Sequence, residues 1–500
     1  MILTIKGDIN RYYVETLCLV FFPGATFGEN EQPGEGVPEI SVTVLDDGPS
    51  NTAYVSIKLN DRISEATETV MKSEPITIAT HSAVAVGRAI FAAGKALLDH
   101  TPPWGILTGV RPAKVAQTLL SAGNGMIKSK KILRDEYFLN PQKAQLAVSV
   151  ASNERKIIKK LDSNTCSLYI SIPFCPTRCA YCSFVSYTTP RLLSMIDEYI
   201  DALIYDLSQT LKTVKELGFR ITTIYIGGGT PTTLSEAQLS KLLGYISAEI
   251  EVSELLEYTL EAGRPDTITE EKLRIAKSFG VTRISVNPQT LNDDILKEIG
   301  RNHTTEQFFR AYEIAKASGI RDINVDLIAG LPGDDFKNFS ATLDKVVSLD
   351  PTNITVHTFC VKKAADVLKT DNSVYSISGG DTAKCVSYAQ LNTKFAGYKP
   401  YYMYRQKNTI GNLENVGFAK EGHESLYNIY MMEEVQTIFA VGAGAVTKLV
   451  DYNKREGTLR IKRIFKPKYP YEYLREEDSR KRGDAPAKKD LKEQALEFYN

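Results

Sequence analysis

The chain has 500 residues, more than one hydrophobic core usually holds, so we expect two or three domains. Its 60 basic and 60 acidic residues cancel, which argues against a protein that binds nucleic acid through a net positive charge. No stretch is apolar and long enough for a signal peptide or a membrane span. We therefore predict a cytoplasmic protein with no nucleic-acid partner and no membrane span.

Residues 1–160 are predicted to form a separate α+β accessory domain. Two alternating segments, 40–48 and 52–60, flank a turn-forming cluster and predict a β-hairpin. Helical periodicity follows at 83–99 and 112–123. Trp104 is the only tryptophan, and we interpret it as a packing anchor rather than part of a site.

From 165 to 365 the pattern becomes a regular alternation of apolar strands and amphipathic helices. Six strands are predicted, at 167–174, 222–229, 257–263, 283–288, 322–330 and 353–360. Helical segments such as 234–250 and 308–319 separate most of them, which indicates an α/β fold with a parallel sheet. Polar residues gather at the carboxyl ends of these strands, where such folds build their sites.

The remaining chain is less regular. Residues 366–465 are predicted to form a smaller mixed C-terminal domain that acts as a substrate domain or lid. Residues 466–500 are rich in charge and predict a solvated helix or a partly disordered tail.

The stretch "SIPFCPTRCAYCSF", residues 171–184, places Cys175, Cys179 and Cys182 on one loop. Seven cysteines, an odd number, argue against a disulfide framework and for thiolate chemistry. Cys179 and Cys182 alone would also suit a redox pair or half of a zinc site. The other four cysteines are isolated and supply no second pair: Cys18, Cys166, Cys360 and Cys385. Three soft ligands instead suit an iron–sulfur cluster in which one iron has no protein ligand.

The C-x-x-x-C-x-x-C spacing after a first strand resembles the radical S-adenosylmethionine (SAM) superfamily. The resemblance implies a partial (β/α)6 barrel. It also implies that the three thiolates bind a [4Fe–4S] cluster and that SAM binds to the iron without a protein ligand. The two cofactors would together generate a 5′-deoxyadenosyl radical that abstracts hydrogen from the substrate. The segments "GGGTPT", "EAGRPD", "SVNPQT", "IGRNH" and "VDLIAGLPGD" narrow the likeness to the oxygen-independent coproporphyrinogen III oxidase family. "PPWGILTGVRP" and "YYMYRQKNTIGNLENVGFAKEG" resemble its Firmicute-type coproporphyrinogen dehydrogenase-like branch, so the likeness spans most of the chain.

The resemblance assigns roles to matching positions. Tyr169 and Tyr181 would line SAM, and Gly228 would contact it. Gly229 and Thr230 would contact a second SAM molecule. The residues that would form the polar shell of the first molecule are Glu261, Gln289, Arg301 and Asp326. Cys360 and Val446 match further cofactor contacts, of which Val446 rests only on a glycine-rich stretch.

The function implied by the family is oxidative decarboxylation of coproporphyrinogen III to protoporphyrinogen IX in haem biosynthesis. A tetrapyrrole would be the substrate, and a flavodoxin- or ferredoxin-type reductant would serve the cluster. Arg405 and Lys407 would suit propionates, and Tyr401, Tyr402 and Tyr404 would suit pyrroles, although a packed tyrosine-rich segment explains them equally well.

Two positions depart from the oxidases and keep alternatives open. Phe184 stands where the oxidases have a further cysteine, and Ser171 where they have a histidine. Phe184 is typical of the haem-chaperone branch, so a haem-binding chaperone is the alternative, with His357, His423, Cys360 or Cys385 as candidate axial ligands. A radical SAM enzyme acting on another tetrapyrrole is a further alternative.

Overall fold

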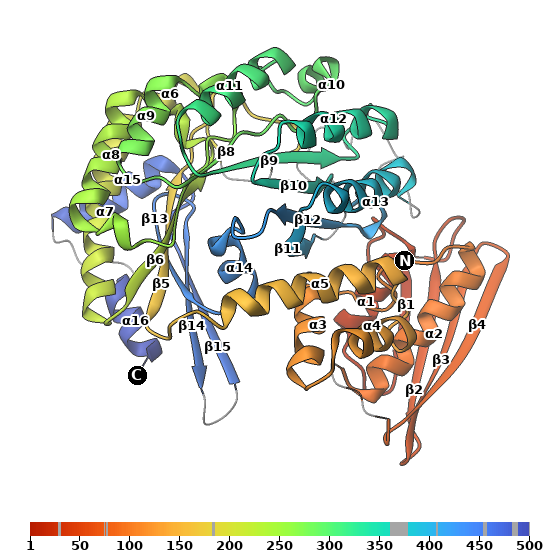
Figure 1. Ribbon diagram of the computed structural model, residues 1–500. Helices are drawn as coiled ribbons and strands as arrows, with labels where there is room; N and C mark the ends of the chain where they lie inside the picture. The colour runs from red at the N-terminus through yellow and green to blue at the C-terminus, as the bar shows by residue number, and fades with distance from the viewer. Residues whose placement is uncertain are drawn as a thin grey trace. The chain divides into compact units, whose positions relative to one another are not determined.

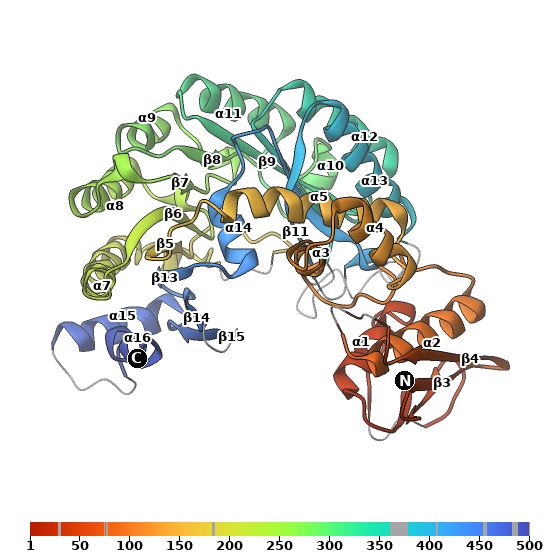
Figure 2. The same cartoon turned by 60° about the horizontal axis from the view of Figure 1, so that its bottom comes forward.

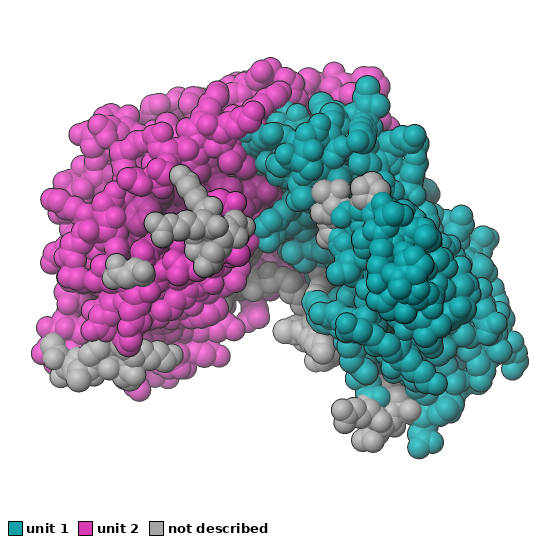
Figure 3. All heavy atoms as spheres, turned by 90° about the horizontal axis from the view of Figure 1, so that it is seen from below, with its two compact units in different colours: residues 1–155, 357–390, 400–416 teal, residues 156–356, 391–399, 417–500 magenta. Residues whose placement is uncertain are grey.

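The computed structural model describes residues 1–28, 32–74, 76, 79–182, 186–360, 379–406, 409–453, 458–482 and 489–499. The chain divides into two compact units, coloured teal and magenta in Figure 3. Unit 1 comprises Met1–Arg155, His357–Gln390 and Pro400–Val416, and unit 2 comprises Lys156–Val356, Leu391–Lys399 and Gly417–Asn500. The four-part division expected from the sequence stays a prediction.

Unit 1 contains, in chain order, β1 (Ile2–Lys6), α1 (Arg11–Phe21), β2 (Glu39–Asp46), β3 (Ser50–Leu59), β4 (Arg62–Met71), α2 (His81–Leu98), α3 (Pro112–Ser121), α4 (Met126–Asp135), most of α5 (Pro141–Ile158), and parts of α13 (Gly380–Phe395), β11 (Lys399–Arg405) and β12 (Glu414–Ala419).

The predicted hairpin of the N-terminal region is confirmed as β2 and β3. These strands are antiparallel neighbours in a four-stranded sheet of order β1-β2-β3-β4, in which β1 and β2 run parallel. Ile40, Val42 and Val44 alternate with more exposed residues and point to the buried face. The turn closes because Asp46 Oδ1 accepts the amide of Gly48, whose φ of +81° suits glycine. Figures 1 and 2 show α2 lying along this sheet.

Trp104 is the packing anchor that the sequence predicts. Its side chain is fully buried, and Nε1 donates to Glu414 Oε2 at 2.9 Å. The same carboxylate accepts from Lys143 Nζ at 2.5 Å and from Gln390 Nε2 at 2.6 Å. A buried carboxylate is stable here because a cation and two neutral donors surround it.

Unit 2 contains, in chain order, β5 (Thr165–Ile172), α6 (Pro190–Leu193), α7 (Ile196–Glu216), β6 (Arg220–Gly228), α8 (Glu236–Glu249), β7 (Glu257–Leu260), α9 (Glu270–Ser278), β8 (Arg283–Ser285), α10 (Asp293–Glu298), α11 (Thr305–Ala317), β9 (Asp322–Ala329), α12 (Phe336–Ser348), most of β10 (Asn353–Thr358), α14 (Leu426–Glu433), β13 (Thr437–Val441), β14 (Val446–Asn453), β15 (Thr458–Phe465), α15 (Pro470–Lys481) and α16 (Leu491–Tyr499).

The six predicted strands are confirmed as β5 to β10, and they are neighbours in chain order. The pairs from β5 to β9 are all parallel. The strands read as continuous apolar runs because both faces are covered; all four residues of β7 are buried, for example. Ser235 and Thr304 start α8 and α11 with capping boxes to Gln238 and Gln307. Figure 1 shows these helices on the outer side of the strands, so the fold is α/β of the expected class.

Two features of the C-terminal region differ from the sequence interpretation. The glycine-rich segment around 437–446 is not irregular: β13 pairs parallel with β5, register Ile438 to Ser167, and the hairpin β14–β15 follows it. The charged tail is not simply solvated, because α15 buries Tyr473 and Glu477. Lys466 lies 3.5 Å and Arg480 3.0 Å from the Glu477 carboxyl, so two cations offset part of the cost of burying this group.

A buried ion network lies at the amino ends of the parallel strands. Glu257, the first residue of β7, accepts the amide of Leu426 at 2.8 Å and the hydroxyl of Ser425 at 3.0 Å, so it caps α14. Arg283, at the start of β8, pairs with Glu257 and Asp322, each at 3.3 Å. Helix α14 is therefore fixed beneath β7 and β8.

Among the described residues, no helix has both the length and the apolar character needed to cross a membrane.

Candidate functional site

The three-cysteine loop follows β5, and backbone hydrogen bonds fix both of its sides. The amide of Cys175 donates to the carbonyl of Tyr187 at 3.1 Å, and the amide of Ala180 donates to the carbonyl of Ile299 at 3.0 Å. Cys175 and Cys179 are buried and Cys182 is half-buried. The loop is thus fixed beyond the carboxyl end of β5, the side of the sheet where parallel-strand folds place their sites.

The thiols are close enough to influence one another. Burial raises the pKa of Cys175 to about 11; the Thr230 hydroxyl, 3.3 Å from its Sγ, opposes this rise, and the charges of Cys182 and Cys179 add to it. Neighbouring thiolates need a cationic centre to be deprotonated together. Within the described ranges, no three His, Cys, Asp or Glu side chains are grouped to hold a single metal ion. Three thiols on one loop suit a group that takes one thiolate for each of three irons, so the residues present fit the expected [4Fe–4S] cluster.

The glycine run after β6 brings the backbone against this loop. A Cβ on Gly229 would lie 2.6 Å from the Phe174 carbonyl oxygen and 3.0 Å from Cys175 Sγ. Gly228 has a φ of +109°, and a Cβ there would lie 2.9 Å from Ser171 Oγ. The close approach that the sequence assigns to a ligand is thus, in part, an approach of two chain segments.

Glu261 follows β7 and is half-buried. Burial and the nearby Asp326 carboxylate raise its pKa to about 8, while the amide of Gly228 and the charge of Arg301 lower it. Two carboxyl groups side by side are costly unless a proton or a cation lies between them. This pair is therefore suited to an ammonium group or another donor-rich ligand.

Asp326 lies on β9, and Gln289 lies beyond the end of the neighbouring strand β8. Asp326 accepts from Asn287 Nδ2 at 2.8 Å and from Asn324 Nδ2 at 2.6 Å, while the amide of Gln289 donates to the Asp326 carbonyl at 3.1 Å. Gln289 has a φ of +69°, which is unfavourable for a residue with a side chain. Its Oε1 is buried without a hydrogen-bond partner. A strained backbone and an orphaned amide oxygen together indicate a place where a ligand donor binds.

Arg301 connects the loop to the polar shell. Its Nε donates to the Tyr181 hydroxyl at 3.0 Å, and its Nη1 donates to the Gly263 carbonyl at 3.0 Å. Tyr181 precedes Cys182, so the guanidinium lies against the three-cysteine loop and next to Gly263, two residues beyond Glu261. The structure thus brings the predicted residues Arg301 and Tyr181 into contact.

Tyr169 lies on β5 below the loop. Its ring stacks on Tyr225 at 6.1 Å and on Tyr427 at 6.3 Å, and Tyr225 and Tyr427 are 4.7 Å apart. Burial raises the pKa of Tyr169, and the charge of Glu261 raises it further, which locates the phenol near that carboxylate.

Three residues of this site were not singled out by sequence reasoning: Asn287, Arg264 and Thr177. Arg264 is buried and donates to Thr177 and to Cys179 Sγ. Both Asn287 and Arg264 lie inside segments that the sequence analysis quoted, "SVNPQT" and "EAGRPD". Their positions were therefore visible, but nothing local predicts which polar side chain of such a segment turns inward.

Two further predicted positions, Val446 and Cys360, have known contacts in other segments. Val446 starts β14 and pairs with Phe465 in a hairpin. Cys360 belongs to unit 1, where it forms an isolated bridge with Thr409. Phe184 lies outside the described residues. The roles of Val446 and Cys360 stay predictions.

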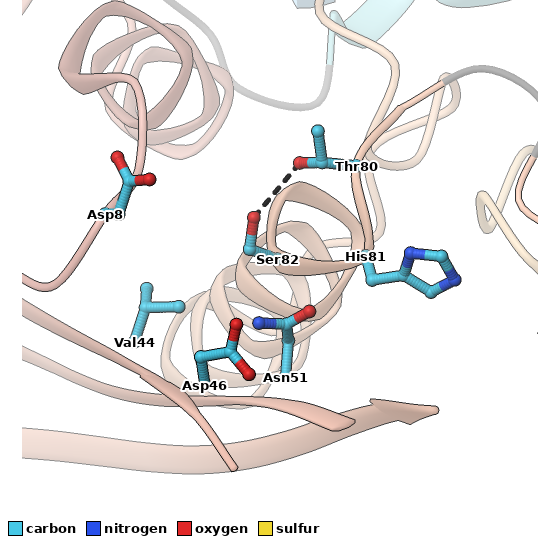
Figure 4. Close-up of a pocket in the computed structure, with 7 residues that line it drawn as sticks. All are labelled: Asp8, Val44, Asp46, Asn51, Thr80, His81 and Ser82. Carbon is cyan, nitrogen blue, oxygen red and sulfur yellow. Dashed lines mark hydrogen bonds between the residues drawn. The ribbon is translucent and has the colours of Figure 1, made fainter. Parts of the chain in front are cut away.

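A shallow pocket of about 230 Å³ in unit 1 is lined by Asp8, Val44, Asp46, Asn51, Thr80, His81 and Ser82. Figure 4 shows these residues around the start of α2. Two carboxylates already supply the negative charge that a helix N-terminus favours, and none of the predicted site residues lies here.

The tyrosine-rich segment is the strand β11. Tyr401 and Tyr402 are buried, and Arg405 is only 4 % exposed, with Nη1 donating to the Leu107 carbonyl at 2.6 Å and the guanidinium 5.5 Å from the Trp104 ring. The packed interpretation therefore holds for these three residues in this structure, and Lys407 lies outside the described residues.

The two histidines proposed as axial ligands are both engaged. His423 Nδ1 lies 2.5 Å from Asp322 Oδ1, and His357 Nδ1 lies 3.3 Å from the Tyr404 hydroxyl.

The comparisons with known proteins agree with this geometry. The model of the radical SAM superfamily matches residues 169–346. The oxygen-independent coproporphyrinogen-III oxidase-like protein HemZ of Bacillus subtilis (strain 168) is 38% identical over 377 residues, which cover 75% of this chain and 74% of that protein. The heme chaperone HemW of the same organism is 34% identical over 56% of this chain and 70% of its own length.

The solved structure of coproporphyrinogen III oxidase (HemN) from Escherichia coli aligns with 66% of this chain and 72% of its own, at 19% identity and a TM-score of 0.48, a likeness too weak to bear on function. The sequence relatives are close and long enough to decide the family. The chain belongs to the radical SAM superfamily, whose cofactors are a [4Fe–4S] cluster and SAM, and within it to the oxygen-independent coproporphyrinogen III oxidase family.

Proposed function

We propose that this protein is a radical SAM enzyme that oxidatively decarboxylates coproporphyrinogen III to protoporphyrinogen IX. The observation that carries the proposal is the single site formed by the three-cysteine loop, the Glu261–Asp326 pair, Arg301 and the unpartnered Oε1 of Gln289. The substrate is inferred from the family and from the HemZ relative.

In this proposal Cys175, Cys179 and Cys182 are the cluster ligands. When bound, the reduced cluster and SAM would supply radical chemistry that removes one hydrogen atom from each of two substrate propionates; loss of carbon dioxide would then leave one electron per propionate, which would pass to an external electron acceptor. The chain's own task is to hold the ligand and keep water out. The buried loop and the glycines that seal it against β6 serve that purpose.

The polar shell would hold SAM through complementary charges. With a pKa of about 8, the Glu261 carboxyl retains a proton at neutral pH, and an ammonium group that enters beside Asp326 would displace it. Gln289 Oε1 would accept a hydrogen bond from a donor group of SAM, and the Arg301 guanidinium would pair with the carboxylate of SAM. Tyr169 and Tyr181 would line the ligand, with Gly228 beneath it. Gly229 and Thr230 would contact a second SAM molecule.

The electrons for the cluster require a donor. A flavodoxin- or ferredoxin-type reductant fits this need, and we include it in the proposal as a class of partner rather than as a docked protein.

A haem-binding chaperone is the second candidate, favoured by the 34% identity to a relative named heme chaperone. Ser171 counts against decarboxylation rather than for haem binding: it is buried, and its Oγ donates to the Ala443 carbonyl at 2.9 Å. The position that is a histidine in the oxidases thus serves packing here.

An anaerobic assay separates the two functions. The reconstituted protein is incubated with SAM, a chemical reductant, an external electron acceptor and coproporphyrinogen III, and vinyl products are measured by chromatography and mass spectrometry after oxidation to the porphyrin. We expect protoporphyrin in the wild type and none in Cys179→Ala. Cleavage of SAM without any vinyl product would reject decarboxylation, and stoichiometric haem binding under those conditions would favour the chaperone.

A further inference from the structure

Arg264 lies beside one of the three cysteines without being part of the three-cysteine loop. It follows β7 in the segment Glu261–Asp266, and its side chain is 4 % exposed. Its Nη1 lies 3.8 Å from Cys179 Sγ, within hydrogen-bonding distance of a sulfur acceptor, and is the donor of that contact. A cationic donor therefore lies next to a thiol that is proposed to carry one iron.

The same Nη1 fixes the loop between Cys175 and Cys179. It donates to the Thr177 hydroxyl at 2.9 Å and to the Thr177 carbonyl at 3.2 Å. The Thr177 hydroxyl in turn donates to the Gly300 carbonyl at 3.2 Å, next to Arg301. Arg264 thus connects the segment after β7 to the three-cysteine loop, and Thr177 connects this loop to Gly300, the residue before Arg301.

Asp266 fixes the orientation of the Arg264 guanidinium. Its two carboxylate oxygens accept from Arg264 Nε at 3.1 Å and from Nη2 at 3.0 Å, the bidentate arrangement that guanidinium and carboxylate favour. With Nε and Nη2 held in this way, Nη1 is directed towards Thr177 and Cys179. The carboxylate also offsets the buried charge, so the pair is stable away from water.

We propose that Arg264 is a positioning residue that holds Cys179 in its ligand geometry and raises the reduction potential of the cluster. The inference rests on the proposed ligand set and deepens it. Hydrogen bonds to cluster sulfurs and positive charge near the cluster both stabilise the reduced form, which carries one more negative charge. Arg264 supplies both effects, and Asp266 limits the second.

The principal test is the midpoint potential of the bound cluster, measured by redox titration monitored by electron paramagnetic resonance. Arg264→Met removes the donor and the charge at similar length, and we expect a shift to lower potential. Arg264→Lys keeps the charge and one donor, so it should restore part of the shift. Asp266→Asn removes the offsetting charge but keeps Arg264, and we expect a shift to higher potential.

A spectroscopic test addresses the hydrogen bond itself. Protein labelled with ¹⁵N only in arginine should show a weak ¹⁵N coupling to the reduced cluster in pulsed resonance spectra of the wild type, and Arg264→Met should lose it. Arg274→Met is the matched control, because Arg274 also pairs with a carboxylate, Glu271, but is exposed on α9. It should change neither the potential nor the coupling.

The outcomes separate this inference from the proposed function. If the wild type assembles no cluster on the three cysteines, the proposed ligand set fails. If the cluster is intact but the wild type lacks a ¹⁵N coupling, or Arg264→Met keeps the wild-type potential, the inference about Arg264 is wrong. Should Arg264→Met lose its cluster, the wild-type coupling and the shift in Asp266→Asn still decide the question.

Discussion

Tyr199 donates its hydroxyl to the carbonyl oxygen of Ser171 at 2.8 Å, which joins α7 to the end of β5 just before the three-cysteine loop. The same hydroxyl accepts the amide of Ala443 at 2.8 Å, in the glycine-rich turn after β13. One buried phenol therefore satisfies two backbone groups on separate segments, and it packs edge-on against Phe174 at 5.1 Å.

Tyr199→Phe should weaken this junction. The change leaves a buried carbonyl and a buried amide without partners, so we expect the free energy of unfolding of the apo-protein to fall by about 1–3 kcal/mol. Urea unfolding followed by circular dichroism measures it. Tyr452→Phe, at an exposed position on β14, is the control and should change stability little. A Tyr199→Phe protein as stable as the wild type would show that water replaces the phenol.

Cys179→Ala should abolish cluster assembly while the fold persists, because the loop is tied by backbone bonds at Cys175 and Ala180 that the substitution leaves in place. Iron and sulfide content, together with the electron paramagnetic resonance spectrum, measure the cluster, and circular dichroism measures the fold. Cys18→Ala, at a buried thiol on α1, should retain full iron content. A complete [4Fe–4S] signal in Cys179→Ala would contradict the ligand assignment.

Gln289→Gly should trade ligand binding for stability. Glycine relieves the φ of +69° and removes a buried amide oxygen that lacks a partner, so the apo-protein should gain about 1 kcal/mol in unfolding free energy. Affinity for SAM, measured anaerobically by equilibrium dialysis, should fall at least about tenfold with the loss of one hydrogen bond.

Asp99→Gly provides the comparison for this trade. Asp99 ends α2 with a φ of 50° and is exposed, so the change should stabilise the protein without affecting SAM binding. Unchanged SAM affinity in Gln289→Gly would remove Gln289 from the proposed shell.

Glu414→Leu should cost about 3–5 kcal/mol, because it leaves Lys143 buried without its anion. The double variant Lys143→Met/Glu414→Leu should recover most of this loss, although Trp104 Nε1 would still lack its acceptor. A double-mutant cycle on unfolding free energies measures the coupling. Additive losses would mean that the two side chains do not act as a pair.

Glu477 should make stability fall as pH rises. Burial, followed by the nearby Asp206 charge, raises its pKa from 4.5 to about 7. Between these values the folded protein binds more protons than the unfolded chain, so the contribution of Glu477 to stability is full below pH 4.5 and is lost as the pH rises past 7.

Urea unfolding at pH 5 and pH 7.5 tests this dependence. Glu477→Gln should remove that part of the pH dependence, whereas Glu476→Gln, one residue away and half-exposed, should not. An identical pH profile in wild type and Glu477→Gln would refute the assignment.

The sequence predicts the strands of unit 2 well, because continuous apolar runs bounded by glycine and polar residues leave little choice of structure. It fails at β13, whose five residues are too short to be distinguished from a loop, and whose pairing with β5 is decided more than 260 residues away in the chain. Such long-range pairing carries no local signal.

The same limit applies to the site. The three cysteines are visible from spacing alone, and the polar shell follows from a family resemblance. The role of Arg264 depends on Asp266 turning its guanidinium towards Thr177, and the strain at Gln289 depends on the neighbouring β9 backbone. Both are consequences of tertiary packing that a linear pattern does not contain.

The position of the capped helix α14 has a consequence for access to the candidate site. With Glu257 fixing its first turn and Tyr427 stacked on Tyr225 and Tyr169, the amino side of β5 to β7 is filled by protein up to the level of Glu261. A molecule bound near Glu261 would therefore not be reached from the amino side of these strands.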